Sequence, residues 1–165
     1  MPKSKRAMFS ISELHQACVE VENLERSIEH YQGLLGIGPW QVYEFDDSVI
    51  SDMTYHGKPA RHKFRAALTT VGPMQLELIQ PVEGNTTYGD FLKQHGEGLH
   101  HLGLVPVENL EEALQMWEKE GCPSLQSGRI KSGAFAGARY AYVGTVKLLG
   151  TILELVERPK ETPSL

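Results

Sequence analysis

Two histidines and two glutamates stand at corresponding places in two halves of this chain, and together they could bind a metal ion. His15 and His101 each stand six residues before a Val-Glu-Asn-Leu-Glu box, so the copies are offset by 101 − 15 = 86 residues. Each copy ends in a Leu-Glu-Leu segment, centred on Glu77 and Glu154. Two imidazoles and two carboxylates suit one divalent ion such as Zn, Ni, Co, Mn or Fe(II). A repeat of this kind predicts one site at the junction of the copies.

The two glutamates are unusual because each stands in the middle of an apolar strand pattern. An unpaired carboxylate costs several kcal/mol to bury, so a cation or hydrogen-bond donors must compensate it. Each Glu could instead lie on a solvated sheet face or pair with Lys or Arg. The same anomaly in both copies, each with a matching His, favours the metal site. A substrate with two adjacent oxygens could chelate there, and an enolate formed by loss of the neighbouring proton would be stabilised.

Each histidine could be either a structural residue or a metal ligand. Seven are present, and a lone His is more often a hydrogen-bonded structural residue than a ligand. His15 and His101 are distinguished only by their equivalence across the repeat. His100 is adjacent to His101, and neighbouring strand residues point to opposite faces. We therefore expect only one of this pair to join the site.

The elements that must position these residues follow a βαβββ order in each copy. Asn23 and Asn109 are good N-caps, each followed by apolar residues at helical spacing. A strand precedes each helix and three follow it, whereas the polar stretch 46–62 is interpreted as a long loop. A single unit would expose an apolar sheet face, so two must pair. The fold class is α+β, with a cupped, mostly antiparallel mixed sheet around a central cavity and helices outside. The expected divisions are a tail (1–11), a first module (12–81), a linker with a short helix (82–98), a second module (99–158) and a tail (159–165).

Composition narrows the function classes. The net charge is −5, so a nucleic-acid partner is not indicated. No segment approaches the roughly 20 apolar residues that cross a bilayer. The only cysteines, Cys18 and Cys122, form no Cys-x-x-Cys pair, which argues against thiolate-held zinc and fits a cytoplasmic protein. Both are interpreted as core or surface fillers.

These motifs resemble the vicinal oxygen chelate superfamily, the group of glyoxalase I, bleomycin resistance proteins, extradiol dioxygenases and methylmalonyl-CoA epimerase. The resemblance covers roughly residues 12–158 and is closest to the epimerases, which share the Gly-Leu-His-His quartet ending at His101. It implies that the metal ligands are His15, Glu77, His101 and Glu154. It also implies a homodimer with a complete site in each chain.

The chain departs from the epimerases in one respect. Those enzymes are thought to use a glutamate base on the strand before the second ligand, and the stretch 63–69 has no carboxylate. Glu154 or Glu77 could leave the metal and act as the base. His56, His62, Tyr140 or Tyr142 could serve instead, if the 46–62 loop closes over the cavity. The basic cluster that includes His62 and Arg65 is either an anionic-substrate contact or a solvated hairpin edge. The candidate substrate-binding residues are His62, Arg65, Tyr140 and Tyr142.

The sequence is compatible with three functions. The first is an enzyme that moves a proton next to a carbonyl, as an epimerase, an isomerase or a glyoxalase I-type lyase, on a small carbonyl or acyl-CoA-like substrate. The second is a metal-dependent dioxygenase, which usually needs more open metal positions than four protein ligands leave. The third is a non-catalytic small-molecule binding protein of the drug-resistance type, which commonly lacks the ligands. The complete ligand pattern favours the first.

Overall fold

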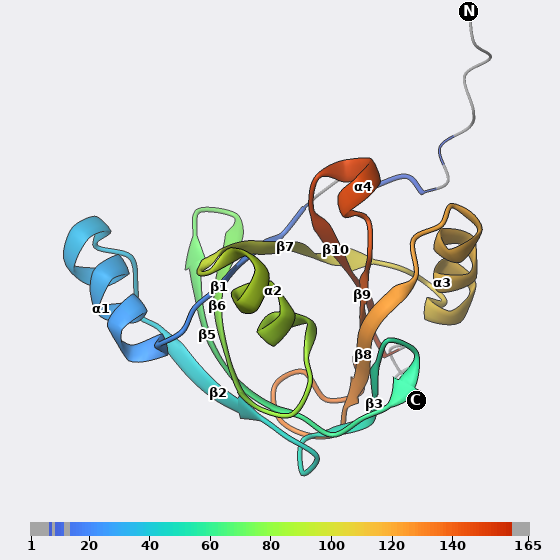
Figure 1. The fold of residues 1–165 in the computed structure, drawn as a ribbon. Coiled ribbons are helices and arrows are strands. Elements are labelled where there is room, and N and C mark those ends of the chain that lie inside the picture. Colours follow the sequence, from blue (N-terminus) through green and yellow to red (C-terminus); the bar gives the residue numbers. More distant parts are fainter. Residues whose placement is uncertain (1–6, 8, 12–13, 160–165) are drawn as a thin grey trace, which may run out of the picture.

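The computed structural model describes residues 7, 9–11 and 14–159, so the tails expected over 1–11 and 159–165 lie largely outside the described residues. Figure 1 shows a strongly curled sheet with α1 and α3 outside it, far apart from each other. No helix in the described residues is long and apolar enough to span a membrane. In chain order the elements are β1 Gln16–Glu20, α1 Leu24–Leu35, β2 Gln41–Phe45, β3 Ile50–Tyr55, β4 Lys58–Pro59, β5 Lys63–Val71, β6 Met74–Glu83, α2 Thr87–His95, β7 Gly98–Pro106, α3 Leu110–Lys119, β8 Ser124–Ile130, β9 Arg139–Val143, α4 Val146–Leu149 and β10 Ile152–Glu157.

The ten strands in the described part of the chain join one sheet in the order β2-β5-β6-β1-β7-β10-β9-β8-β3-β4. The first copy supplies β2-β5-β6-β1 and the second supplies β7-β10-β9-β8, so the same order of strands occurs twice. The copies meet where β1 pairs antiparallel with β7. The pairs β1–β6 and β7–β10 are parallel, and the other pairs are antiparallel. The predicted α+β class, with two paired βαβββ modules in a cupped mixed sheet, is confirmed.

The helices of the two copies begin where the sequence predicts. Asn23 caps α1, with its side chain accepting a hydrogen bond from Arg26 N at 2.8 Å. Asn109 caps α3 in the same way, accepting from Glu112 N at 3.1 Å. Each cap satisfies a backbone N–H that the helix itself leaves without a partner. These caps fix where each chain segment turns away from the strand that carries the candidate ligands.

The two faces of the sheet bury different clusters. Leu24 of α1 and Trp117 of α3 belong to separate apolar clusters on the outer face. The inner face holds the largest cluster, which includes Tyr88 of α2. Figure 1 shows the sheet curling around α2, which therefore fills part of the concave side.

The expectation of a long loop over 46–62 is wrong. Its middle forms the β3–β4 hairpin, and β3 pairs with β8 of the second copy. His56 and Gly57, both at positive φ, make the two-residue turn of this hairpin, which matches the twist of its strands. Ile50 and Met53 point inward and are buried. These two buried residues are three apart and not two or four, so the alternation typical of a strand is absent from the sequence. The cause is a shift in the β3–β8 register between Ser51 and Thr54.

Candidate metal and substrate site

The concave face holds a cavity of about 530 Å³ with two carboxylates among its lining residues. Glu77 comes from β6 and Glu154 from β10, and both side chains are nearly buried. Between these strands lie β1 and β7, the pair at which the two copies meet. Aromatic and aliphatic side chains make most of the wall, among them Phe45, Phe64, Leu68, Leu104 and Phe135. The cavity is therefore an apolar pocket with acidic groups gathered at the junction of the copies.

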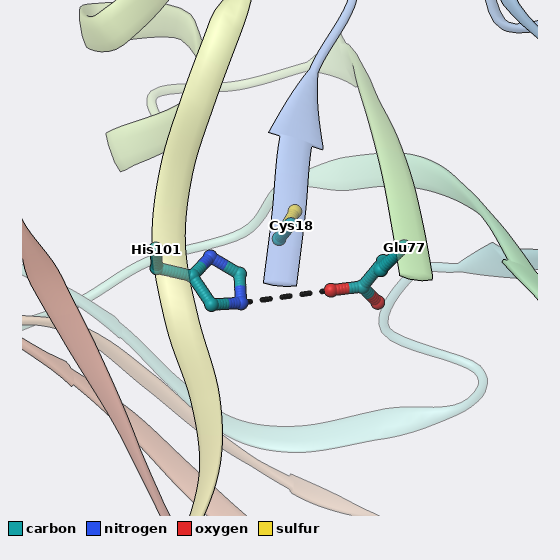
Figure 2. Close-up of side chains that lie close together, drawn as sticks. All are labelled: Cys18, Glu77 and His101. Carbon is teal, nitrogen blue, oxygen red and sulfur yellow. Dashed lines mark ion pairs between the residues drawn. The ribbon is translucent and has the colours of Figure 1, made fainter. Parts of the chain in front are cut away.

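One imidazole faces both carboxylates. His101 Nε2 lies 3.6 Å from Glu77 Oε2 and 3.9 Å from Glu154 Oε2. Figure 2 shows the His101 ring extending from β7 with Nε2 directed at the Glu77 carboxylate. The structure therefore brings three of the four expected ligands together.

His15 is not brought to this group, and Gln16 occupies the corresponding place. The inward residues of β1 are Gln16, Cys18 and Glu20, all buried, whereas the half-buried His15 lines a separate depression beside the start of α3. Gln16 Oε1 lies 3.2 Å from His101 Nε2. Gln16 Nε2 donates to Gln75 Oε1 at 2.7 Å, which aims the amide oxygen at the site.

The physical reason is an irregularity in one copy of the repeat. In the pairing of β7 with β10, three residue steps of β7, from Leu102 to Val105, lie opposite two residue steps of β10. Leu104 lies within this bulge, at φ 58°. This bulge adds one residue between the ligand and the Asn-capped helix in the second copy only. The spatial equivalent of His101 is consequently 85 residues earlier, at Gln16, and not 86.

A second irregularity overturns the expectation that His100 points away. Cys18 pairs with His101 and the next residue, Val19, pairs with Leu99, so His100 is an extra residue in β7. Both imidazoles are buried on the same side, with His100 Nδ1 2.8 Å from His101 Nδ1.

The electrostatics of the group favour a cation. Burial raises the pKa of both glutamates well above the usual range, and repulsion from Glu154 adds to the rise at Glu77. Burial and the neighbouring His100 lower the pKa of His101, so its imidazole is neutral. Among the described residues, His101 is the only basic side chain paired with either carboxylate. A divalent ion would supply the missing positive charge.

Two of the donor oxygens lie close against the backbone of Gly103. Gly103 of β7 faces them, and a Cβ at this position would lie 2.6 Å from Glu154 Oε2 and closer still to Gln16 Oε1. Only glycine leaves this point open. The donor set is one imidazole nitrogen, two carboxylates and one amide oxygen, which suits divalent first-row metals. The residues present therefore fit a divalent metal ion.

The comparisons with known proteins agree with this architecture. The family model of the glyoxalase/bleomycin resistance protein/dioxygenase superfamily matches residues 15–142. The chain belongs to this superfamily. A Bacillus subtilis (strain 168) protein, YqjC, is 27% identical over 95 residues, a match that spans 58% of this chain and 66% of YqjC.

Solved structures of the superfamily fold match nearly the whole chain. Methylmalonyl-CoA epimerase from Mycobacterium tuberculosis has a TM-score of 0.60 at 21% identity, covering 96% of this chain and 95% of its own. A Streptomyces coelicolor methylmalonyl-CoA epimerase variant in complex with 2-nitronate-propionyl-CoA has a TM-score of 0.57 at 17% identity, with coverages of 92% and 100%. The hypothetical protein BH1468 from Bacillus halodurans C-125 has a TM-score of 0.58 at 19% identity, with coverages of 92% and 98%. At these identities the likeness concerns the fold.

Within this superfamily fold, Cys18 lies beside the candidate ligands. Its sulfur is within 4.8 Å of the donor atoms of Glu77 and His101, and Figure 2 shows it on β1 between them. Cys18 is fully buried, and burial together with the adjacent carboxylates raises the pKa of its thiol. A neutral thiol is a poor metal ligand. The interpretation of Cys18 as a core residue is consistent with its place in the inner cluster.

The expected substrate contacts divide into two groups. Tyr140 and Tyr142 line the cavity, and Tyr142 accepts a hydrogen bond from Tyr88 at 2.8 Å. His62 is buried away from the cavity lining, and neither of its ring nitrogens has a hydrogen-bond partner among the residues that the structure describes. Arg65 pairs with Glu25 and Glu44 outside the cavity. Arg65 is therefore not positioned to meet a ligand in the cavity.

Two residues at the site, Gln16 and Arg158, were not found from the sequence. Arg158, just after β10, is exposed and lines the cavity, so it is the basic side chain that a ligand there would meet. His56 stands in the β3–β4 turn, 3.7 Å from Asp90 of α2, and does not line the cavity. Gln16 could have been found by counting strand alternation from Cys18 and Glu20 instead of relying on the repeat offset. Arg158 carries no sequence signal of this kind.

Proposed function

We propose that this protein is a divalent-metal-dependent enzyme of the epimerase and glyoxalase type, which moves a proton next to a substrate carbonyl. The observation that carries the proposal is that Gln16, Glu77 and Glu154 all face His101 Nε2 within an apolar cavity. These four side chains would hold the ion, with Gln16 in place of His15. A bound divalent ion would polarise a carbonyl and stabilise negative charge next to it.

The base in this proposal is one of the two glutamates. A glutamate that leaves the ion would regain the raised pKa of the metal-free site, which suits taking up a proton near neutral pH. The backbone N–H of Leu104 donates to Glu154 Oε2 at 3.2 Å and would orient that carboxylate. His62 and His56 are less suitable, because neither lines the cavity.

The proposed substrate is a small carbonyl compound, free or as an acyl-CoA-like thioester. The wall includes Phe45, Phe64 and Tyr140, which would pack against an apolar group and exclude water. Arg158 would attract an anionic part of the same molecule. The acyl-CoA class is supported by fold likeness to an epimerase solved with 2-nitronate-propionyl-CoA.

The proposal extends to assembly and location. All four proposed donors belong to one chain, so each subunit would hold a complete site. We propose that two such subunits form a homodimer. The two cysteines are buried and unpaired, in keeping with a cytoplasmic protein. Light scattering on the purified protein would measure its oligomeric state.

The decisive experiment follows exchange of a substrate's α-proton with solvent deuterium. Acyl-CoA thioesters and 2-oxo compounds would be incubated in D₂O with metal-free protein and with protein supplied with Mn²⁺, Co²⁺, Ni²⁺ or Zn²⁺. We expect metal-dependent exchange of at least one compound. Loss of exchange in Glu154→Gln or Glu77→Gln, with metal retained, would identify the base.

Three outcomes would redirect the assignment. Absence of exchange with every compound and metal would overturn the proton-transfer function and favour the binding-protein alternative. Oxygen uptake with catechols in the presence of Fe²⁺ would favour the dioxygenase alternative. Conversion of a hemithioacetal without epimerisation would place the protein among glyoxalase I-type lyases.

A further inference from the structure

His100 lies one residue from the proposed metal ligand His101 and shares its face of the sheet. The two Nδ1 atoms are 2.8 Å apart, which is hydrogen-bond distance. Such a contact needs one ring nitrogen with a proton and one without. The tautomers of the two rings are therefore coupled, and either ring fixes the other.

The far nitrogen of His100 continues the chain of contacts. His100 Nε2 lies 3.4 Å from Thr87 Oγ1 at the start of α2. The backbone N–H of Thr87 donates in turn to Gln126 Oε1 of β8 at 2.9 Å. His100 and Gln126 are almost completely buried, so these contacts are sheltered from water. A chain of polar contacts thus runs from β8 through α2 to His101.

Aromatic side chains hold the His100 ring in its orientation. The ring centroids of Phe91 and Tyr142 lie 5.3 Å and 5.8 Å from that of His100, each edge to face. Tyr88 is 5.4 Å away in a tilted arrangement. A ring packed in this way cannot turn aside without disturbing α2 and β9.

We propose that His100 is the positioning residue of the metal centre, setting the tautomer of His101 through the Nδ1–Nδ1 hydrogen bond. This inference rests on the proposed metal site. A ligand that binds through Nε2 must carry its proton on Nδ1. His101 Nδ1–H then donates to His100 Nδ1, and His100 Nε2–H faces Thr87 Oγ1. Partners of this kind orient ligating imidazoles and raise their affinity for metal.

The metal-free protein has the opposite arrangement available. There His101 Nε2–H donates to Gln16 Oε1, His100 Nδ1–H donates to His101 Nδ1, and Thr87 Oγ1–H donates to His100 Nε2. Metal binding then shifts both rings to the other tautomer, with no change in the number of protons on the pair. Two linked tautomer changes in adjacent histidines are a signature that packing alone does not produce.

The test combines metal affinity with nitrogen NMR, using Zn²⁺ alone as the diamagnetic probe. His100→Asn keeps an acceptor near the Nδ1 position, whereas His100→Leu removes it, and both lose the aromatic ring. We expect His100→Leu to weaken Zn²⁺ binding about 10- to 100-fold and His100→Asn to stay close to wild type. His30→Leu, at an exposed position of α1, is the control for loss of a histidine. Thr87→Val should give a smaller loss than His100→Leu.

In wild-type protein labelled with ¹⁵N-histidine, Zn²⁺ should move the protonated nitrogen of His101 to Nδ1 and that of His100 to Nε2. Equal Zn²⁺ affinity in wild type and His100→Leu would overturn the positioning role while leaving the metal site intact. Equal losses in His100→Asn and His100→Leu would also overturn it, because the shared loss would then reflect packing. A wild-type protein whose His101 resonances do not respond to Zn²⁺ would overturn both this inference and the proposed function.

Discussion

Gly103→Ala should remove the metal ion while leaving the fold intact. The new Cβ would lie 2.6 Å from Glu154 Oε2, and ordinary van der Waals contact begins at 3.4 Å, so that oxygen would have to retreat by about 0.8 Å. Gln16 Oε1 would have to move farther. Coordination distances hold to within about 0.2 Å, so both donors would leave the ion.

The effect on folding should be small because the atoms that must move are the ends of side chains. The backbone of Gly103 lies outside the left-handed region, so alanine is permitted there. Restricting the unfolded chain contributes about 0.4–1 kcal/mol of stability at a compatible site. This gain offsets part of the cost of moving Gln16. We expect the free energy of unfolding of the metal-free variant to stay within about 1 kcal/mol of wild type.

The assay is calorimetric titration with Co²⁺, together with urea unfolding of the metal-free proteins. The Co²⁺ affinity of Gly103→Ala should fall by more than roughly 10- to 100-fold, which is the loss expected when a metal ligand loses its hydrogen-bond partner. Gly98→Ala is the matched control in the same strand, because its Cβ would meet Phe91 at an ordinary 3.8 Å. Unchanged Co²⁺ affinity in Gly103→Ala would refute the placement of the ion between Gln16 and Glu154.

Three further predictions concern the buried acidic groups and the thiol. Apparent Co²⁺ affinity should rise from about pH 5 to about pH 8, because the raised pKa values of Glu77 and Glu154 oblige them to release protons on binding; a flat profile in pH-stepped titrations would contradict this. Burial raises the pKa of Glu20 to about 10, so the native state holds a proton that the unfolded state loses above about pH 4.5, and stability falls as pH rises toward 10. The free energy of unfolding of Glu20→Gln, measured with urea, should therefore fall less steeply as pH rises, by up to about 1.4 kcal/mol per pH unit. The exposed control variant Glu22→Gln should behave as wild type. Cys18→Ala should retain one metal ion per chain by elemental analysis, because the four proposed donors do not include the thiol; loss of the ion would make Cys18 part of the site.

The sequence predicted the parts of the fold that local patterns determine. Asn23 and Asn109 mark helix starts because an Asn side chain caps a helix whatever the tertiary context. Glu77 and Glu154 can be found because each interrupts an apolar strand pattern at the same place in both copies. These two carboxylates are at the cavity, as the doubled pattern indicated.

The sequence missed features that depend on register. His15 was selected by an offset that assumes equal spacing in both copies, and the bulge near Leu104 makes the spacing unequal. The displacement of His100 onto the face of His101 comes from a second register shift. The sequence does not reveal strand β3, because its pairing partner, β8, is far away in the sequence. Such shifts are set by pairing between strands, so one segment alone does not reveal them.

A crystal structure of the protein grown with Co²⁺, with anomalous scattering recorded at the cobalt edge, is the most direct test of the proposed centre. We predict one anomalous peak per chain among the four proposed donors. It should lie about 2.0–2.3 Å from His101 Nε2, Gln16 Oε1 and an oxygen of each of Glu77 and Glu154. A peak bound by His15, or no peak within reach of the two glutamates, would contradict the account.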